Sequence, residues 1–375
     1  MNSKIAILAT AMGLALVSGA SADTPIVRIT GATSFRSSVH AAIQAIMTGE
    51  TYAYVGTSLS GATQANFTGT VNGQVITVET SWSGSGAGIQ TVAGGLNVTF
   101  LKSDTPQSVA GTAYATAPAT EVGIPDMAMS DVYQASTPFT SPQLTDQLVC
   151  VAPFVFLAND SAPAALTNVT PGLIQSLYFG GALPLALFTG ASADETSLVY
   201  GLGRDPDSGS RITAMAEAGL GAFATVLQYS VTVNGDTISA PVPFPKGTSI
   251  FSTGNNGYSS GGTLAGALAG KSNVATNAFI GYTGIADAVG TAIPGGARAL
   301  TWNGVAYSPT AVQEGQYSFW GYEHLFYKST LAGTALNFAN ALQAQVGAVP
   351  GAAGLTLESM RVSRLGDGAP IGNDY

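Results

Sequence analysis

One stretch of the sequence combines an arginine with hydroxyl groups at the start of a predicted helix. Segment 203–218 begins as a polar turn containing Arg204 and continues into residues that favour helix. Ser208 and Ser210 flank Gly209 where that helix begins. Free backbone N–H groups at a helix N-terminus attract anions, and the planar fork of arginine suits phosphate or carboxylate. The stretch therefore predicts an oxyanion site, with an ordinary capped helix beside a surface arginine as the alternative.

Two earlier turns share this design of hydroxyl and small residues directly before a helix. The sequences Thr-Ser-Phe at 33–35 and Gly-Ser-Gly at 84–86 each precede a predicted helix, and Asp131 stands at the end of a predicted strand. Several helix N-termini can hold a buried anion without a large net positive charge. The three turns together with Arg204 and Asp131 predict one shared anion site.

Length and charge limit the class of protein. The chain has 375 residues, enough for two domains with their own cores. Charged residues make up only 9%, and 12 basic residues against 21 acidic ones give a net charge of −9. Because no cluster of Lys and Arg occurs, nucleic acid is not an expected partner. The single cysteine, Cys150, stands in an apolar strand and is interpreted as a core thiol.

Residues 1–22 have the pattern of an export signal. Lys4 precedes a largely apolar run over 5–17, and Ala-Ser-Ala at 20–22 supplies small residues at a cleavage point. The run is too short to span a bilayer, and no later run is long and apolar enough. We therefore expect an exported, periplasmic protein that does not span the membrane, with the cell surface as the alternative location.

Strand-like and helix-like segments alternate along the chain, which favours an α/β architecture in two lobes. Hairpins are predicted at Asn72-Gly73 and Asn234-Gly235, and the tail over 366–375 is predicted to fray. The main predicted strands are 25–29, 124–129, 149–159, 197–201, 278–282 and 320–328, and the main predicted helices are 36–47, 89–93, 170–178 and 330–346.

Two further patterns suggest other chemistry but carry less weight. Residues 257–261 match the Gly-x-Ser-x-Gly nucleophile turn around Ser259, and His324 follows in the order of a triad. That match lies in a loop rich in Gly, Ser and Asn, with no apolar strand leading directly into it. Residues 265–272 fit a loose phosphate-loop pattern, which we interpret as a helix end. No residues have zinc-ligand spacing, so neither a metal nor another cofactor is expected.

The segments that carry the anion-site residues resemble the phosphate-binding proteins of bacterial ABC importers, within the type II periplasmic binding protein fold. The resemblance covers most of the chain after residue 22, and its spacing from arginine to Ser-Gly-hydroxyl is fairly specific. The matching segments, in the order of the family, are 30–35, 84–89, 129–131, 204–210, 254–257 and 280–282.

The resemblance implies a role for each residue of the site. Asp131 would accept a proton from phosphate, and Arg204 would be its charged partner. Hydroxyl or backbone N–H donors would come from Ser34, Phe35, Ser85, Ser208, Gly209 and Ser210. The chain departs from the family in three ways: serine replaces the usual threonine at 34 and 210, the segment from 85 to 131 and the hairpin at 51–80 are longer, and surface charge is sparse.

A carboxylate at position 131 would distinguish phosphate from sulfate. Phosphate near neutral pH still carries a proton that it can donate, whereas sulfate carries none and would be repelled. Simpler interpretations remain for the single residues. Asp131 or Ser85 would then only cap a turn or helix, and Arg204 would form an ion pair with Asp205 or Asp207.

Together these features predict a two-lobed protein that captures inorganic phosphate in a cleft and delivers it to an ABC importer, whose permease is the expected partner. The resemblance implies one lobe from residues 23–159 plus 321–375 and a second from 160–320. No chemistry on the ligand is required, so we expect a monomeric binding protein rather than an enzyme. The alternatives are an exported phosphatase and an envelope or surface protein that keeps the fold without transport.

Overall fold

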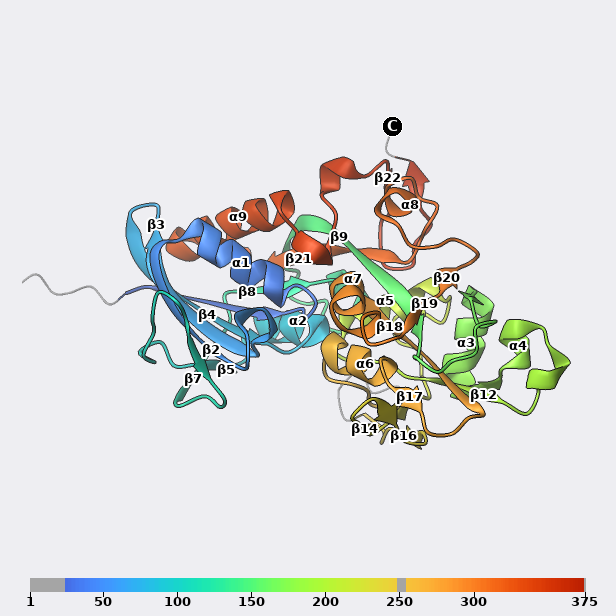
Figure 1. Cartoon of the computed structure of the whole chain (residues 1–375). Coiled ribbons are helices and arrows are strands. Elements are labelled where there is room, and N and C mark those ends of the chain that lie inside the picture. Colours follow the sequence, from blue (N-terminus) through green and yellow to red (C-terminus); the bar gives the residue numbers. More distant parts are fainter. Residues whose placement is uncertain (1–23, 248–253, 374–375) are drawn as a thin grey trace, which may run out of the picture.

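The structure is a computed structural model that describes residues 24–247 and 254–373 (Figure 1). The predicted export signal at 1–22 lies outside the described residues. The helices are α1 (Arg36–Ile46), α2 (Ser85–Gly94), α3 (Pro171–Gly180), α4 (Ala186–Thr189), α5 (Gly209–Glu217), α6 (Gly261–Leu268), α7 (Ile285–Asp287), α8 (Pro309–Gln313) and α9 (Gly333–Ala348).

One large mixed sheet runs through the molecule in the order β11-β12-β18-β9-β21-β8-β1-β4-β3-β2-β6, with β19 (Arg298–Ala299) pairing to β9. Its strands are β1 (Ile26–Gly31), β2 (Thr48–Val55), β3 (Gln64–Val71), β4 (Gln74–Trp82), β6 (Thr112–Tyr114), β8 (Met127–Ser130), β9 (Thr145–Ala158), β11 (Ala182–Pro184), β12 (Leu198–Gly201), β18 (Asn277–Gly284) and β21 (Trp320–Tyr327). Small sheets pair β5 (Val98–Leu101) with β7 (Thr120–Gly123), β10 (Asn168–Val169) with β20 (Thr301–Trp302), β13 (Tyr229–Ser230) with β16 (Val242–Pro243), β22 (Val362–Ser363) with β23 (Gly372–Asn373), and β15 (Thr237–Ile238) with both β14 (Val233–Asn234) and β17 (Lys271–Ser272).

The fold is α/β and has two lobes, as predicted. Figure 1 shows β1–β4, β8, α1, α2 and α9 in one lobe, and β12, β18 and α3–α6 in the other. Strand β9 joins them, because its first half pairs with β21 and its second half, from Phe154 to Ala158, pairs with β18. The lobe boundaries at 159/160 and 320/321 stay a prediction, since β9 takes part in both groups of strands.

Most predicted elements form where the sequence places them. Asn72 and Gly73 both have positive φ between β3 and β4, as a tight type I′ hairpin requires. The predicted strand at 124–129 begins only at Met127, while 120–123 pairs separately as β7. The predicted fraying over 366–375 is wrong as far as residue 373, because β22 and β23 form a hairpin there.

The C-terminal segment ties the two lobes together. Arg364 is buried and forms an ion pair with Glu217 at the end of α5. Three residues later, the Asp367 carboxylate accepts hydrogen bonds from the Tyr133 amide at 3.0 Å and from the Ser136 hydroxyl at 2.6 Å. The segment therefore contacts α5 in one lobe and the loop after β8 in the other.

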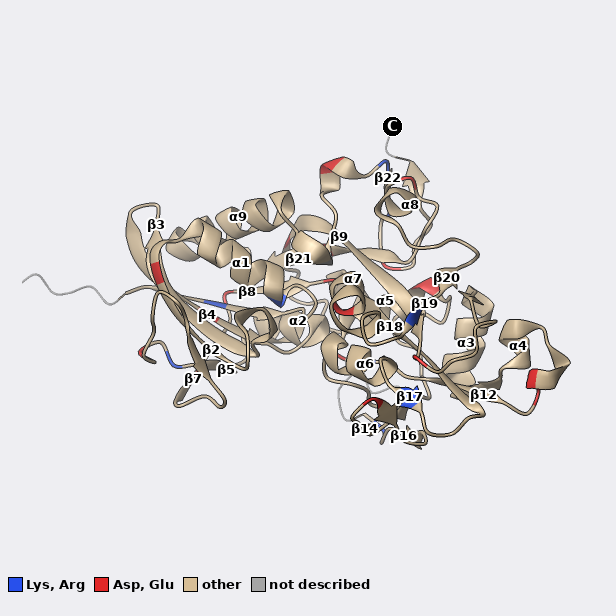
Figure 2. Cartoon of the chain, viewed as in Figure 1, with Lys and Arg blue, Asp and Glu red and all other residues tan. Residues whose placement is uncertain are grey.

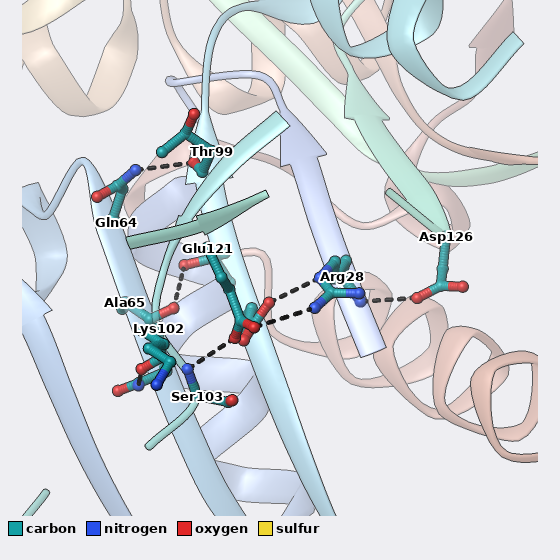
Figure 3. Close-up of polar contacts among 11 residues, drawn as sticks. Arg28, Gln64, Ala65, Thr99, Lys102, Ser103, Glu121 and Asp126 are labelled. Carbon is teal, nitrogen blue, oxygen red and sulfur yellow. Dashed lines mark hydrogen bonds and ion pairs between the residues drawn. The ribbon is translucent and has the colours of Figure 1, made fainter. Parts of the chain in front are cut away.

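Charged residues are few and scattered over both lobes (Figure 2). One partly buried cluster lies in the first lobe, where Figure 3 shows Arg28 of β1 between Glu121 and Asp126. Arg28 also donates to Glu79 of β4 at 2.8 Å. Burial, followed by a hydrogen bond to Glu121, raises the pKa of Glu79 to about 8. That hydrogen bond lowers the pKa of Glu121 to about 2, so the carboxyl pair holds one proton between these limits.

This shared proton makes stability depend on pH. Above pH 4.5 the unfolded chain releases both protons while the folded pair keeps one, so stability falls as pH rises toward 8. We expect Glu79→Gln to flatten this decline, because an amide can donate to Glu121 without taking up a proton. Urea unfolding at pH 5 and pH 8 measures the difference, and Glu314→Gln, at an exposed position, is the control. Equal declines in the wild type and Glu79→Gln would contradict the shared proton.

Within the described residues, no helix has both the length and the apolar character needed to cross a membrane.

Candidate anion site between the lobes

The candidate site lies at the edge of the sheet where three parallel strands end. β1 pairs in parallel with both β4 and β8, so their carboxyl ends meet at one edge. Ligands of α/β folds bind outside such an edge. Gly31 ends β1 with φ of 114°, and a Cβ there would lie 2.0 Å from the Met129 carbonyl oxygen. Only glycine allows this approach, which brings the start of α1 against β8.

Asp131 lies just beyond β8 and accepts hydrogen bonds from two helix starts. The Ser34 hydroxyl donates to Oδ2 at 3.1 Å, and the Ser85 hydroxyl donates to Oδ1. The Asp131 side chain is buried, with 2% exposure. Burial raises the pKa of Asp131, while the two hydroxyls and the charge of Arg204 oppose this rise. The carboxylate is therefore held in place and available as an acceptor in a site with little water.

The three helices that begin here lack side-chain caps. No side-chain hydrogen bond caps α1, α2 or α5. Among the other helices, α3, α6 and α8 are capped by Thr170, Ser260 and Ser308, whereas α4, α7 and α9 have no side-chain cap. The capping alternative for Ser85 is therefore wrong, since its hydroxyl donates to Asp131 instead. The hydroxyl of Ser208, the residue before α5, likewise pairs with a neighbouring serine hydroxyl rather than with the helix amides.

Several backbone donors at these helix starts are left without protein partners. Phe35 is different, because its amide makes a long hydrogen bond of 3.4 Å to the Ala32 carbonyl. A hydrogen bond of this length is weak for a backbone N–H donor. In the described part of the chain, no hydrogen bond is donated by the amides of Ser34, Ser85, Gly209 and Ser210. Unpaired amides at helix N-termini favour an anion.

The second lobe meets the first directly over Asp131. Gly209, the first residue of α5, packs so closely that a Cβ would lie 1.7 Å from Asp131 Oδ1 and 2.7 Å from Ser85 Oγ. Nearby, the Gly86 amide of α2 donates across the cleft to the Asp207 carbonyl at 2.9 Å. The lobes are therefore closed, and the absence of a side chain at position 209 permits that closure.

Arg204 connects the second lobe to the first through hydrogen bonds to carbonyl and hydroxyl oxygens rather than to carboxylates. Its guanidinium donates to the carbonyls of Tyr258 and Ser259 at 2.9 and 3.1 Å. It also reaches the Ser210 hydroxyl at 3.5 Å and, across the cleft, the Thr33 hydroxyl at 3.4 Å. Among the described residues no ion pair joins it to a carboxylate, so the ion-pair alternative is wrong. The arginine is buried beside the hydroxyl groups.

Two buried charged residues of the site were missed by the sequence analysis. Arg211 lies in the first turn of α5 and donates to the Arg204 carbonyl at 3.1 Å. Glu323 lies in β21, which pairs antiparallel with β8. His324 is opposite Ser130 in this pairing, so the next position of the register places Glu323 beside Asp131. Neither oxygen of Glu323 has a hydrogen-bond partner within the described residues. Burial and the Asp131 charge raise the pKa of Glu323 well above its usual range.

The alternative nucleophile turn does not form a triad. Ser259 uses its carbonyl to hold Arg204. His324 is buried in β21, where Nδ1 contacts Asp146 at 2.8 Å and the ring packs against Tyr133. His324 Nε2 has no partner in the described chain, so it does not activate the Ser259 hydroxyl. Residues 265–272 end α6 and enter β17, as interpreted from the sequence.

The structure thus brings the eight predicted residues together from both lobes. Asp131 contacts both helix starts of the first lobe, and Gly209 packs on it from the second. Ser208 and Ser210 share a hydrogen bond of 2.8 Å, and Ser210 contacts Arg204. Their binding of an anion stays a prediction.

No protein-family model matches the sequence, and neither does a curated protein. Among solved structures, one similar protein is described as the substrate-binding protein of a phosphate ABC transporter with bound phosphate, from Clostridium perfringens. It is 14% identical, with 84% of this chain and 92% of that chain covered and a TM-score of 0.49. An ABC-type phosphate transport receptor from Vibrio cholerae is 13% identical, with coverages of 84% and 93% and a TM-score of 0.45.

The regulatory domain of OxyR2 from Vibrio vulnificus is also similar, at 8% identity, coverages of 86% and 94%, and a TM-score of 0.42. Identities this low say nothing about the ligand, which has to be argued from the site itself.

Proposed function

We propose that this protein captures inorganic phosphate between its two lobes. The observation that carries the proposal is the convergence of three uncapped helix starts on one buried cluster that contains both Arg204 and Asp131. The hydroxyls and unpaired amides supply donors for phosphate oxygens, and the arginine supplies positive charge. Asp131 supplies the single acceptor, which suits an anion that still carries a proton.

Capture would couple to closure of the lobes. The hydroxyls of Ser34 and Ser85 would rotate from Asp131 toward the anion, and Arg204 with α5 would contact it from the other lobe. Binding energy shared between both lobes stabilises the closed arrangement. The cluster places no activated nucleophile beside the anion, so the proposed role is binding. We propose export by the signal at 1–22 and delivery to the permease of an ABC importer.

Calorimetric titration of the purified protein, with bound anion removed, tests the proposal. We expect phosphate to bind and sulfate to give no heat at neutral pH. If neither anion binds, the proposed function is wrong, and an envelope or surface protein that keeps the fold without transport becomes the better interpretation. If sulfate binds as well as phosphate, the proposed role of Asp131 is wrong while anion capture stands.

A further inference from the structure

A polar pocket adjoins the candidate anion site at Ser34. It is lined by Thr33, Ser34, Arg36 and Ser60 of the first lobe and by Asp287 and Thr291 of the second. Ser34 is half-buried, whereas the other seven residues of the candidate site are buried. A group attached to a bound anion would therefore leave the closed site past Ser34 and enter this pocket.

Arg36 is a charged group without a partner in that pocket. It is the first residue of α1 and makes no hydrogen bond or ion pair within the described residues. Burial lowers the pKa of Arg36, the charge of Asp287 raises it, and the charge of Arg204 lowers it. Because Arg36 lines an open pocket, water can accept hydrogen bonds from its guanidinium, and a ligand acceptor that replaces this water would form a charge-assisted hydrogen bond. Its position next to Ser34 makes a bound ligand a suitable source of that acceptor.

Asp287 gives the pocket a negative group opposite Arg36. Its carboxylate packs against the start of α6, where a Cβ at Gly261 would lie 1.9 Å from Oδ2. The charges of Arg204 and then Arg36 oppose the rise in the Asp287 pKa that burial causes. One cation, one anion and several hydroxyl groups suit a polar substituent that is uncharged or that carries an ammonium group to pair with Asp287. A second phosphate group would meet the carboxylate of Asp287, which disfavours it.

We propose that the protein also binds phosphomonoesters with a short polar substituent, whose phosphoryl group occupies the anion site and whose substituent contacts Arg36 and Asp287. This inference rests on the proposed function, because it places the phosphoryl group in the same cluster. It extends that function from inorganic phosphate to a class of small organic phosphates.

The protonation state of the ester sets the conditions of the test. A phosphomonoester has a second pKa of about 6, so its dianion at neutral pH has no proton to give to Asp131. At pH 5.5 most of the ester is the monoanion, which carries that proton. Titrations therefore compare inorganic phosphate with glycerol phosphate at pH 5.5, using the full protein with bound anion removed.

We expect glycerol phosphate to bind the wild type and Arg36→Met to weaken that binding about tenfold, which is the loss of one charge-assisted hydrogen bond. Inorganic phosphate affinity falls less than about threefold, because solvent screens a charge that does not touch the phosphoryl group. Arg361→Met, at an exposed arginine paired with Glu314, is the matched control and leaves both affinities unchanged. Thermal unfolding verifies that each variant is folded.

A second variant separates the two charges of the pocket. Asp287→Asn weakens binding of phosphoethanolamine, whose ammonium group needs an anion, more than binding of glycerol phosphate. The inference is overturned if phosphate binds but glycerol phosphate does not, or if Arg36→Met weakens both ligands equally. If neither inorganic phosphate nor glycerol phosphate binds at pH 5.5, the proposed function itself fails and this inference fails with it, so the two failures are distinguishable.

Discussion

Gly209→Ala is expected to weaken phosphate binding by about a hundredfold or more. The methyl group would lie 1.7 Å from Asp131 Oδ1, which is far shorter than the contact distance of two nonbonded atoms. Asp131 cannot move aside without leaving the hydroxyls of Ser34 and Ser85, which hold it in a buried site. The lobes must then stay apart, and α5 cannot contact an anion held at the first lobe.

The control is Gly172→Ala, because Gly172 also lies in the first turn of a helix and its Cβ would meet nothing within 4 Å. Titration with phosphate compares the two variants, and small-angle scattering reports whether the lobes close. We expect Gly172→Ala to bind like the wild type and Gly209→Ala to remain open when phosphate is added. Wild-type affinity in Gly209→Ala would show that anion binding does not require α5 to approach Asp131 this closely.

The members of the candidate site could be predicted from the sequence because each has a local signal. Hydroxyl and glycine residues directly before a helix mark its start, and Asp131 directly follows an apolar strand. Parallel strands then bring such positions to one edge. The hydrogen bond from Ser85 to Asp131, which excludes capping by Ser85, could not be predicted. A serine before a helix has the same sequence pattern whether it caps the helix or donates to a distant carboxylate.

Residues whose surroundings come from distant segments were missed. Glu323 lies within the predicted strand at 320–328, and only the register of that strand with β8 places it beside Asp131. Arg36 was counted as part of an amphipathic helix, and its relation to Asp287 depends on how the lobes meet. The C-terminal tail has a glycine-rich sequence typical of fraying, but Asp367 is held by residues more than 200 positions earlier.

Local sequence patterns also do not predict that one continuous sheet runs through both lobes. Residues 149–159 were predicted as one apolar strand, and β9 indeed covers most of them. Nothing in its alternation shows that one half pairs with β21 and the other with β18, because strand order depends on long-range pairing rather than on the strand itself. That shared strand is what fixes the two lobes side by side around the candidate site.

Asp131→Asn is expected to convert a phosphate-selective site into one that also binds sulfate, changing the ratio of the two affinities by about a hundredfold. The buried carboxylate presents only lone pairs, so an anion without a proton is repelled in a site with little water to screen the charges. An asparagine removes the negative charge and adds an N–H donor. Sulfate gains from both changes, whereas phosphate loses the acceptor for its proton.

Competition titrations of phosphate and sulfate at neutral pH measure this ratio. Asp126→Asn is the control, because Asp126 lies at the opposite end of β8 and its carboxylate accepts from the Arg28 amide at 2.8 Å. We expect that variant to keep the wild-type ratio even if its stability falls. If Asp131→Asn still excludes sulfate while binding phosphate, discrimination must arise elsewhere. Glu323, the carboxyl beside Asp131, would be the next group to replace, because loss of the Asp131 charge lowers its pKa and an ionised Glu323 would itself repel sulfate.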